Sequence, residues 1–157
     1  MYKRLMTALI LTFAASPFTH AGITNIKEIA NNTTGVVFVK NLDDANTIFT
    51  LRGGVTGNIL ANGVWSGEMW IPWAVNSGDF SSHHIRVTVT TPVANSSETR
   101  VTEFFIWQAG DFVRFNRERR FVENAPKVPG LARVNGERRL VVTERNSQIS
   151  FRLEEYK

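Results

Sequence analysis

One short segment holds most of the tryptophans and is the best candidate for a ligand-binding site. Residues 63–73 have the sequence GVWSGEMWIPW and contain three of the four tryptophans, Trp65, Trp70 and Trp73. An exposed indole can stack on a sugar ring, cover an apolar ligand or lie at a membrane interface. Glu68, in the same segment, is suited to orient a bound sugar through hydrogen bonds.

The alternative for these tryptophans is that they fill the interior of the fold, as large aromatic residues usually do. Trp70 and Trp73 are three positions apart, so in an extended strand they face opposite ways and at most one enters a core. The glycines and Pro72 favour a loop or a loop-to-strand transition in this segment. We therefore expect Trp65 and one of the other two tryptophans to be exposed.

A second candidate site is basic and belongs to the last third of the chain, where most of the arginines occur. The arginine guanidinium is a planar fork that suits phosphate, sulfate and carboxylate groups. The alternative is a solvated face, because glutamates are interleaved with these arginines. The residues that we assign to an anionic ligand are Arg117, Arg119, Arg120, Arg133 and Arg138.

Two adjacent histidines are the candidates for acid–base chemistry. Neighbouring residues of a strand point to opposite faces, so His83 and His84 cannot share one metal ion without a bend. No zinc-type ligand spacing is present, and we predict neither a metal nor another cofactor. Either histidine could act as a general base beside Asp79 or Glu68, which is the chemistry of a small hydrolase. The alternative is a pair of strand-edge histidines with no special role.

The motifs of common enzyme classes are absent from the sequence. It has no Gly-x-Ser-x-Gly nucleophile turn and no glycine-rich phosphate loop. Glycosidase chemistry needs two carboxyl groups that face each other across a cleft, and the sequence alone pairs none. We therefore assign no catalytic residue and favour a binding protein over an enzyme.

Short apolar strands separated by turn residues must position these side chains. The pattern predicts an all-β fold of about nine strands with little helix, an antiparallel β-sandwich of jelly-roll-like or immunoglobulin-like kind. The strands are expected at residues 35–41, 47–51, 69–75, 84–91, 100–108, 111–115, 131–134, 138–143 and 148–154.

Three further patterns concern local structure. The isoleucines at every third position of residues 23–29 fit either a helical turn or an irregular edge strand. Asn135 and Gly136 are the preferred residues of a two-residue hairpin turn, and this hairpin would place Arg133 directly opposite Arg138. A second hairpin is expected to turn at residues 109–110.

The first 21 residues have the parts of a secretory signal peptide. Lys3 and Arg4 are the positive start, residues 5–15 are almost wholly apolar, and cleavage is expected after Ala21. The mature chain is then residues 22–157, which we expect to form one domain in the bacterial periplasm or outside the cell. The sequence has no cysteine, so packing alone must stabilise this domain.

These observations favour a secreted, non-catalytic binding module. Its expected partner is a glycan or another anionic surface ligand, held by the tryptophan segment and by the arginines of the last third. Two alternatives are a small secreted hydrolase that uses His83 or His84 and a membrane-active toxin or lysin that inserts the tryptophans into lipid. Nucleic acid is not expected as a partner, because the protein is predicted to be exported.

Overall fold

Alternating apolar side chains build the strands of this chain, whose computed structural model describes residues 22–53 and 63–157. β9 (Gln148–Glu155) is the clearest case, because Ile149, Phe151 and Leu153 are buried while the residues between them are exposed. The expected signal peptide lies outside the described residues.

Within these residues the chain forms nine strands and one short helix. Their bounds are β1 (Thr24–Asn32), β2 (Val36–Asn41), β3 (Ile48–Arg52), β4 (Gly63–Trp70), α1 (Ser77–Ser82), β5 (Ile85–Pro92), β6 (Thr99–Ala109), β7 (Phe112–Asn116), β8 (Gly136–Arg145) and β9 (Gln148–Glu155).

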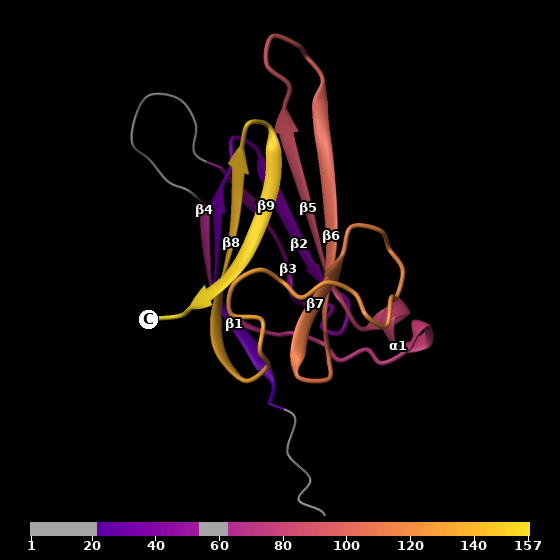
Figure 1. The fold of residues 1–157 in the computed structure, drawn as a ribbon. Coiled ribbons are helices and arrows are strands. Elements are labelled where there is room, and N and C mark those ends of the chain that lie inside the picture. The colour runs from indigo at the N-terminus through magenta and orange to yellow at the C-terminus, as the bar shows by residue number, and fades with distance from the viewer. Residues whose placement is uncertain (1–21, 54–62) are drawn as a thin grey trace, which may run out of the picture.

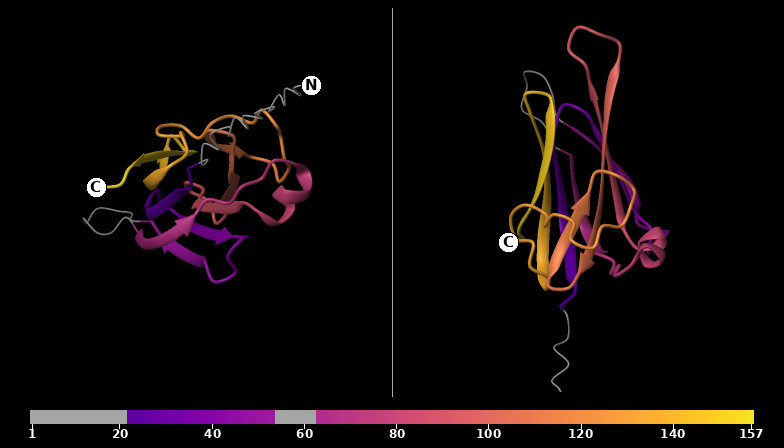
Figure 2. Two further views of the ribbon diagram at one scale, coloured as in Figure 1. Left: turned by 90° about the horizontal axis from the view of Figure 1, so that it is seen from below. Right: turned by 45° about the vertical axis from the view of Figure 1, so that its right-hand side comes forward.

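The strands form two sheets that pack face to face (Figure 1, Figure 2). One sheet has the order β4-β1-β8-β9 and the other has the order β3-β2-β5-β6-β7. Neighbouring strands are antiparallel except β1 and β8, which are parallel. The predicted all-β sandwich of about nine strands is therefore confirmed.

The main hydrophobic core lies between the two sheets. Phe104 of β6 stacks on Phe151 of β9, with ring centroids 3.9 Å apart and an interplanar angle of 5°. Phe115 of β7 meets the same Phe151 ring edge-on, at a centroid distance of 4.8 Å. These aromatic contacts join the two sheets in a chain that has no cysteine to cross-link them.

A second apolar cluster covers the outer face of the five-stranded sheet. Phe105 and Trp107 of β6 point away from the main core and pack under Phe80 of α1. The second half of β6, residues 104–108, is therefore buried on both faces, as the apolar end of its sequence predicts for a central strand. No helix of the described residues combines the length and the apolar character that a membrane crossing requires.

The tryptophan segment differs from its predicted structure. β4 covers Gly63–Trp70, whereas the sequence predicts a loop or a loop-to-strand transition in this segment and a strand only over residues 69–75. β4 is an edge strand of its sheet, and most of its side chains are exposed. It therefore lacks the apolar alternation that makes the other strands recognisable.

The predicted hairpin at residues 135–136 is wrong. Both residues have the positive φ that the turn requires, 93° and 91°, but residues 131–134 form no strand. β8 pairs with β1 and β9 instead, and Arg133 lies opposite Phe112 rather than opposite Arg138. The Arg138 guanidinium donates hydrogen bonds to carbonyls of the preceding loop. A strand distant in sequence has thus taken the place of the local partner.

The first strand is also placed differently from either expectation. β1 lies between β4 and β8, so it is neither a helical turn nor an edge strand. Ile26 and Ile29 are both buried although they are an odd number of residues apart. A register shift between Ile26 and Glu28 explains this, because the extra residue of a bulge returns the next side chains to the same face.

The hairpin predicted at residues 109–110 is confirmed as the connection between β6 and β7. Its turn residues are Gly110 and Asp111, one position later than expected. Gly110 has a φ of 57°, which glycine adopts without steric strain.

Candidate functional site

Two of the predicted tryptophans line one pocket of about 620 Å³ at the end of β4. Trp70 is the last residue of β4, and Trp73 belongs to the segment that follows it. Asp43, which follows β2, lines the same pocket. Asp79 and His83, in and directly after α1, complete its polar side. The pocket therefore joins residues that the sequence assigned to two separate sites.

Gln108 of β6 fixes the backbone that carries these tryptophans. Its side chain is buried, accepts a hydrogen bond from the Thr24 backbone N–H (2.8 Å) and donates one to the Ile71 carbonyl (3.0 Å). The backbone N–H of Gln108 donates a hydrogen bond to the Pro72 carbonyl (2.7 Å), and its backbone carbonyl accepts one from the Ala74 N–H (3.0 Å). Residues 71–74 are thus bonded to a central strand, which keeps the pocket preformed.

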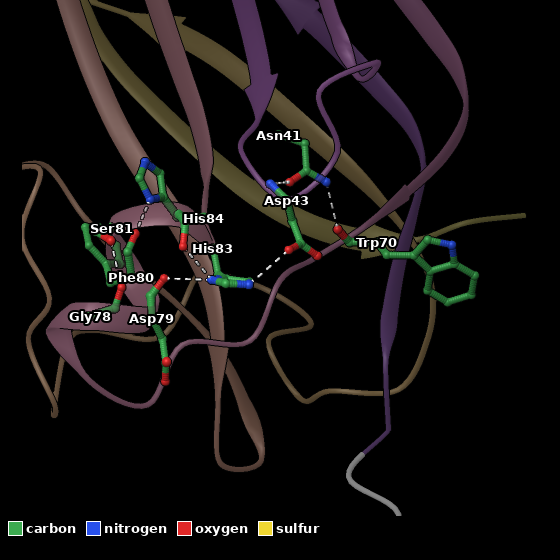
Figure 3. A network of polar contacts seen from close by, with 10 residues as sticks. Asn41, Asp43, Trp70, Gly78, Asp79, Phe80, Ser81, His83 and His84 are labelled. Atoms are coloured by element: carbon green, nitrogen blue, oxygen red, sulfur yellow. Dashed lines mark hydrogen bonds and ion pairs between the residues drawn. The ribbon is translucent and has the colours of Figure 1, made fainter.

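Asn41, at the end of β2, connects the polar side of the pocket to its aromatic side. Its buried amide group donates to the Trp70 carbonyl (3.1 Å) and accepts from the Asp43 backbone N–H (3.0 Å) (Figure 3). One side chain therefore positions Trp70 and Asp43 together. Neither Asn41 nor Gln108 was identified from the sequence, because a polar residue inside a strand gives no sign of its distant partners.

The three tryptophans of the segment have different surroundings. Trp70 is 52% exposed, and Trp73 is half-buried. Trp65 is also half-buried, because its ring stacks on Phe49 of β3 at 4.6 Å with an interplanar angle of 5°. It packs against the main core and does not line the pocket. The expected exposure is therefore found for Trp70 and only in part for Trp65.

His83 lies at the edge of the pocket, where it caps the C-terminus of α1. Its Nε2 is 3.2 Å from a carboxylate oxygen of Asp43, and its Nδ1 is 3.0 Å from the backbone carbonyl of Asp79. In Figure 3 the Asp43 carboxylate is directed at the imidazole ring, while the Trp70 indole points outward. Asp43 is thus the carboxylate that contacts His83, in place of the predicted Asp79 or Glu68.

The two predicted carboxylates have other partners. Asp79 lies in the first turn of α1, whose N-cap is Asn76, and its carboxylate accepts hydrogen bonds from the Asn76 side chain (2.9 Å) and the Val75 N–H (3.3 Å). Glu68 pairs with Lys27 at 2.7 Å. Asp43 could not be chosen from the sequence, because its contact with His83 joins residues of two separate loops.

Ser82 lies beside the same histidine. Its Oγ is 2.9 Å from Nδ1 of His83, and this nitrogen also faces the Asp79 carbonyl, which accepts a hydrogen bond from the His83 backbone N–H (2.9 Å). The Asp79 carbonyl at Nδ1 and the Asp43 carboxylate at Nε2 are both acceptors, and a neutral imidazole has one N–H to donate. The tautomer that donates to Asp43 leaves Nδ1 as the acceptor for the Ser82 hydroxyl, which is the arrangement a general base requires.

His84 points to the opposite side of the chain and is fully buried beneath α1. Its Nδ1 donates to the Phe80 carbonyl (2.5 Å), and its ring stacks on the Phe80 ring at 4.5 Å. Burial lowers the pKa of His84 below its ordinary value of 6.5, and the positive charges of Arg119 and Arg86 act in the same direction. The hydrogen bond to Phe80 opposes this shift. His84 is a neutral core residue at neutral pH.

The five predicted arginines do not gather around the tryptophans, since none of them lines the Trp70–Trp73 pocket. Arg117 lines a separate cleft, and Arg119 and Arg120 lie beside Phe80 and Phe121 near α1. Arg133 lies in the segment before β8, and Arg138 is the third residue of β8. The structure therefore separates the aromatic and the basic parts of the predicted site.

No three histidine, aspartate or glutamate side chains lie close enough to hold a metal ion across residues 22–53 and 63–157. Comparisons with protein-family models, with curated proteins and with solved structures find no match for this chain. Its function therefore has to be inferred from the pocket and its side chains.

Proposed function

We propose that this protein is a non-catalytic binding module that holds a carbohydrate in the pocket between Trp70 and Trp73. The observation that carries the proposal is that the half-exposed Trp70 lines one pocket together with the polar side chains of Asp43, Asp79 and His83. A sugar ring has apolar C–H faces and polar hydroxyls, so it needs both kinds of contact. The indole covers an apolar face, and the carboxylates and the imidazole bond to the hydroxyls.

The size and the rigidity of the pocket support a small ligand. Its volume of about 620 Å³ lies within the range of ~300–1,000 Å³ that is usual for small-molecule sites. The hydrogen bonds of Gln108 and Asn41 hold its walls in place before a ligand arrives. Binding to a preformed site costs less conformational entropy than binding that must first order a loop.

The charge of the pocket selects against acidic sugars. Asp43 and Asp79 bring two carboxylates to its rim, and the candidate arginines are elsewhere. A neutral or an amino sugar therefore fits this pocket better than a sulfated or carboxylated one. The anionic ligand expected from the arginines requires a different surface.

We also infer that the protein acts outside the cytoplasm, because residues 1–21 have the pattern of a signal peptide. N-terminal sequencing of the exported protein tests this inference. The expected first residue is Gly22, and an exported chain that still begins at Met1 would contradict it.

The binding proposal is tested with neutral and amino-sugar glycans on an array, followed by calorimetry with the glycan that binds most tightly. Trp70→Ala and Trp73→Ala should each weaken binding about tenfold or more, because tryptophans in ligand contacts often contribute most of the affinity. Trp65→Ala is the matched control, since it removes an indole of the same segment that does not line the pocket. Circular dichroism shows whether each variant is folded at the temperature of the assay.

Two outcomes would contradict the proposal. One is that no neutral or amino sugar binds the wild-type protein. The other is that Trp65→Ala lowers the affinity as much as Trp70→Ala while both variants remain folded.

One observation favours a second candidate function, a hydrolase. His83 and Asp43 are in contact at the edge of the pocket, so the histidine has an orienting carboxylate. The assay is hydrolysis of generic ester, glycoside and phosphoester substrates by the wild-type protein and by the His83→Ala and Asp43→Asn variants. Substrate turnover that is unchanged in both His83→Ala and Asp43→Asn would exclude a hydrolase that uses this histidine.

Another observation favours membrane insertion. Trp70 and Ile23 line the pocket together, and each is 52% exposed. An exposed tryptophan beside an exposed aliphatic residue suits a lipid interface. Leakage of phosphatidylcholine vesicles that is lost in Trp70→Ala would support this function, and the absence of leakage would exclude it.

A further inference from the structure

The space between the two sheets changes from apolar to polar near the β8–β9 turn. Arg100 and Thr102 share the face of β6 that carries Phe104, which stacks on Phe151 in the main core. Arg100 therefore occupies an inward-facing position in which an apolar residue would extend the core. Arg100 itself is exposed, whereas Thr91, its neighbour on β5, is a buried polar residue.

A cleft of about 660 Å³ opens at this position. β7 ends at Asn116, which pairs with Phe105, so the first residues of β6 have no strand neighbour on that side in the described structure. Arg117 follows directly after β7 and lines the cleft together with Arg100 and Thr102. The β8–β9 turn and the start of β9 form another wall, with Gln148 among its polar residues. In Figure 1 this turn lies at the far end of the sandwich from α1, and Asp79 of α1 lines the Trp70 pocket.

Two guanidinium groups are held in this cleft by backbone carbonyls. Arg100 Nη1 donates to the Ser147 carbonyl (2.6 Å), and Arg117 Nη2 donates to the Ile149 carbonyl (3.2 Å). In the part of the chain that the structure describes, neither guanidinium pairs with a carboxylate. The cleft therefore brings two positive charges together with no compensating negative charge, and each retains N–H groups that could bind an acceptor.

We propose that this cleft is an oxyanion site, in which Arg100 and Arg117 bind a sulfate or carboxylate group carried on a sugar. Arginine binds both groups through paired N–H donors, and two arginines can share one oxyanion. The cleft has the volume of a small-ligand site rather than of a single ion, and Thr102 and Gln148 offer polar groups for sugar hydroxyls. The site is separate from the Trp70 pocket and does not depend on its function.

Calorimetry with lactose 3′-sulfate, with lactose and with inorganic sulfate tests this proposal at a fixed salt concentration. Lactose 3′-sulfate should bind more tightly than either lactose or sulfate alone. Arg100→Gln and Arg117→Gln should each weaken its binding about tenfold or more, because each removes charged hydrogen bonds. The Trp70→Ala variant should bind it as the wild-type protein does.

Arg133→Gln is the matched control, because it removes the same charge far from the cleft: Arg133 lies opposite Phe112, which pairs with Ala109 at the other end of β6. An equal loss of affinity in Arg133→Gln and Arg100→Gln would show general attraction to a basic protein and would overturn the site. Binding of lactose as tight as that of its sulfate would overturn the role of the anion. Inorganic sulfate that binds as tightly as the sulfated sugar would overturn the assignment of a sugar ligand. Circular dichroism of Arg100→Gln, Arg117→Gln and Arg133→Gln shows whether each variant is folded in the assay.

Discussion

The buried side chain of Gln108 should be one of the most sensitive polar positions of the fold. Its amide oxygen accepts from the Thr24 N–H at the start of β1, and its amide nitrogen donates to the Ile71 carbonyl beside the tryptophans. Thr24 and Ile71 are themselves buried, at 0% and 1% exposure. Water therefore cannot replace the side chain when it is removed.

The perturbation is Gln108→Leu, which keeps approximately the volume and removes both hydrogen bonds. A buried backbone group that is left without a partner costs about 1–3 kcal/mol, so the two groups together cost roughly 2–6 kcal/mol. The gain from burying an apolar leucine offsets about 1 kcal/mol of this cost. The expected loss of about 1–5 kcal/mol is a large share of the roughly 5–15 kcal/mol by which a domain is usually stable.

Equilibrium unfolding in urea, followed by tryptophan fluorescence, measures the loss. Gln148→Leu is the control, because Gln148 is exposed and its substitution should change the free energy of unfolding by less than about 0.5 kcal/mol. If Gln108→Leu unfolds at the same urea concentration and with the same slope as Gln148→Leu, the side chain does not satisfy these two backbone groups. The account of how the tryptophan segment is held would then be wrong.

Three further substitutions follow from the packing. Burial lowers the pKa of His84 in the folded protein below its ordinary 6.5, so the unfolded chain binds more protons than the folded protein as the pH falls. The free energy of unfolding that is present above about pH 6.5 is therefore partly lost in acid. Urea unfolding between about pH 7.5 and pH 5 should show a smaller loss of this free energy in His84→Phe than in the wild-type protein. Gly130 has a φ of 86°, and an added Cβ would lie 2.2 Å from the Leu153 carbonyl oxygen, so Gly130→Ala should lower the free energy of unfolding by about 1–3 kcal/mol or more. Phe104→Ala removes the ring that stacks on Phe151 and should cost about 3–5 kcal/mol by the same measurement, and a cost below about 1 kcal/mol would contradict the assignment of this pair to the core.

Where a strand buries one face, the sequence predicted it well. β9 alternates between buried and exposed residues, and it was expected within one residue of its observed bounds. β4 was misplaced because it is an edge strand with most of its side chains exposed, so its residues carry no period of two. The first strand was ambiguous because the bulge between Ile26 and Glu28 disturbs that period.

The sequence predicted several residues of the candidate site but not which of them lie together. The tryptophan segment was found from composition, and Trp70 is exposed as such a site requires. Asp43 was not among the carboxylates named from the sequence, yet it contacts His83, which lies forty positions further along the chain. Such a contact depends on how two loops pack, and no sequence pattern in either loop predicts that it will contact the other.

The sequence by itself determined the class of fold, the lack of cross-links and the identity of the side chains available for binding. Each of these depends on composition or on neighbours two positions apart, so it can be derived before the chain is folded. The tertiary structure alone decided that β1 pairs with β8, that Trp70 and Trp73 share a pocket with Asp43 and His83, and that the candidate arginines lie elsewhere. These are contacts between distant segments, and their free energy comes from burying whole sheet faces together rather than from any local pattern.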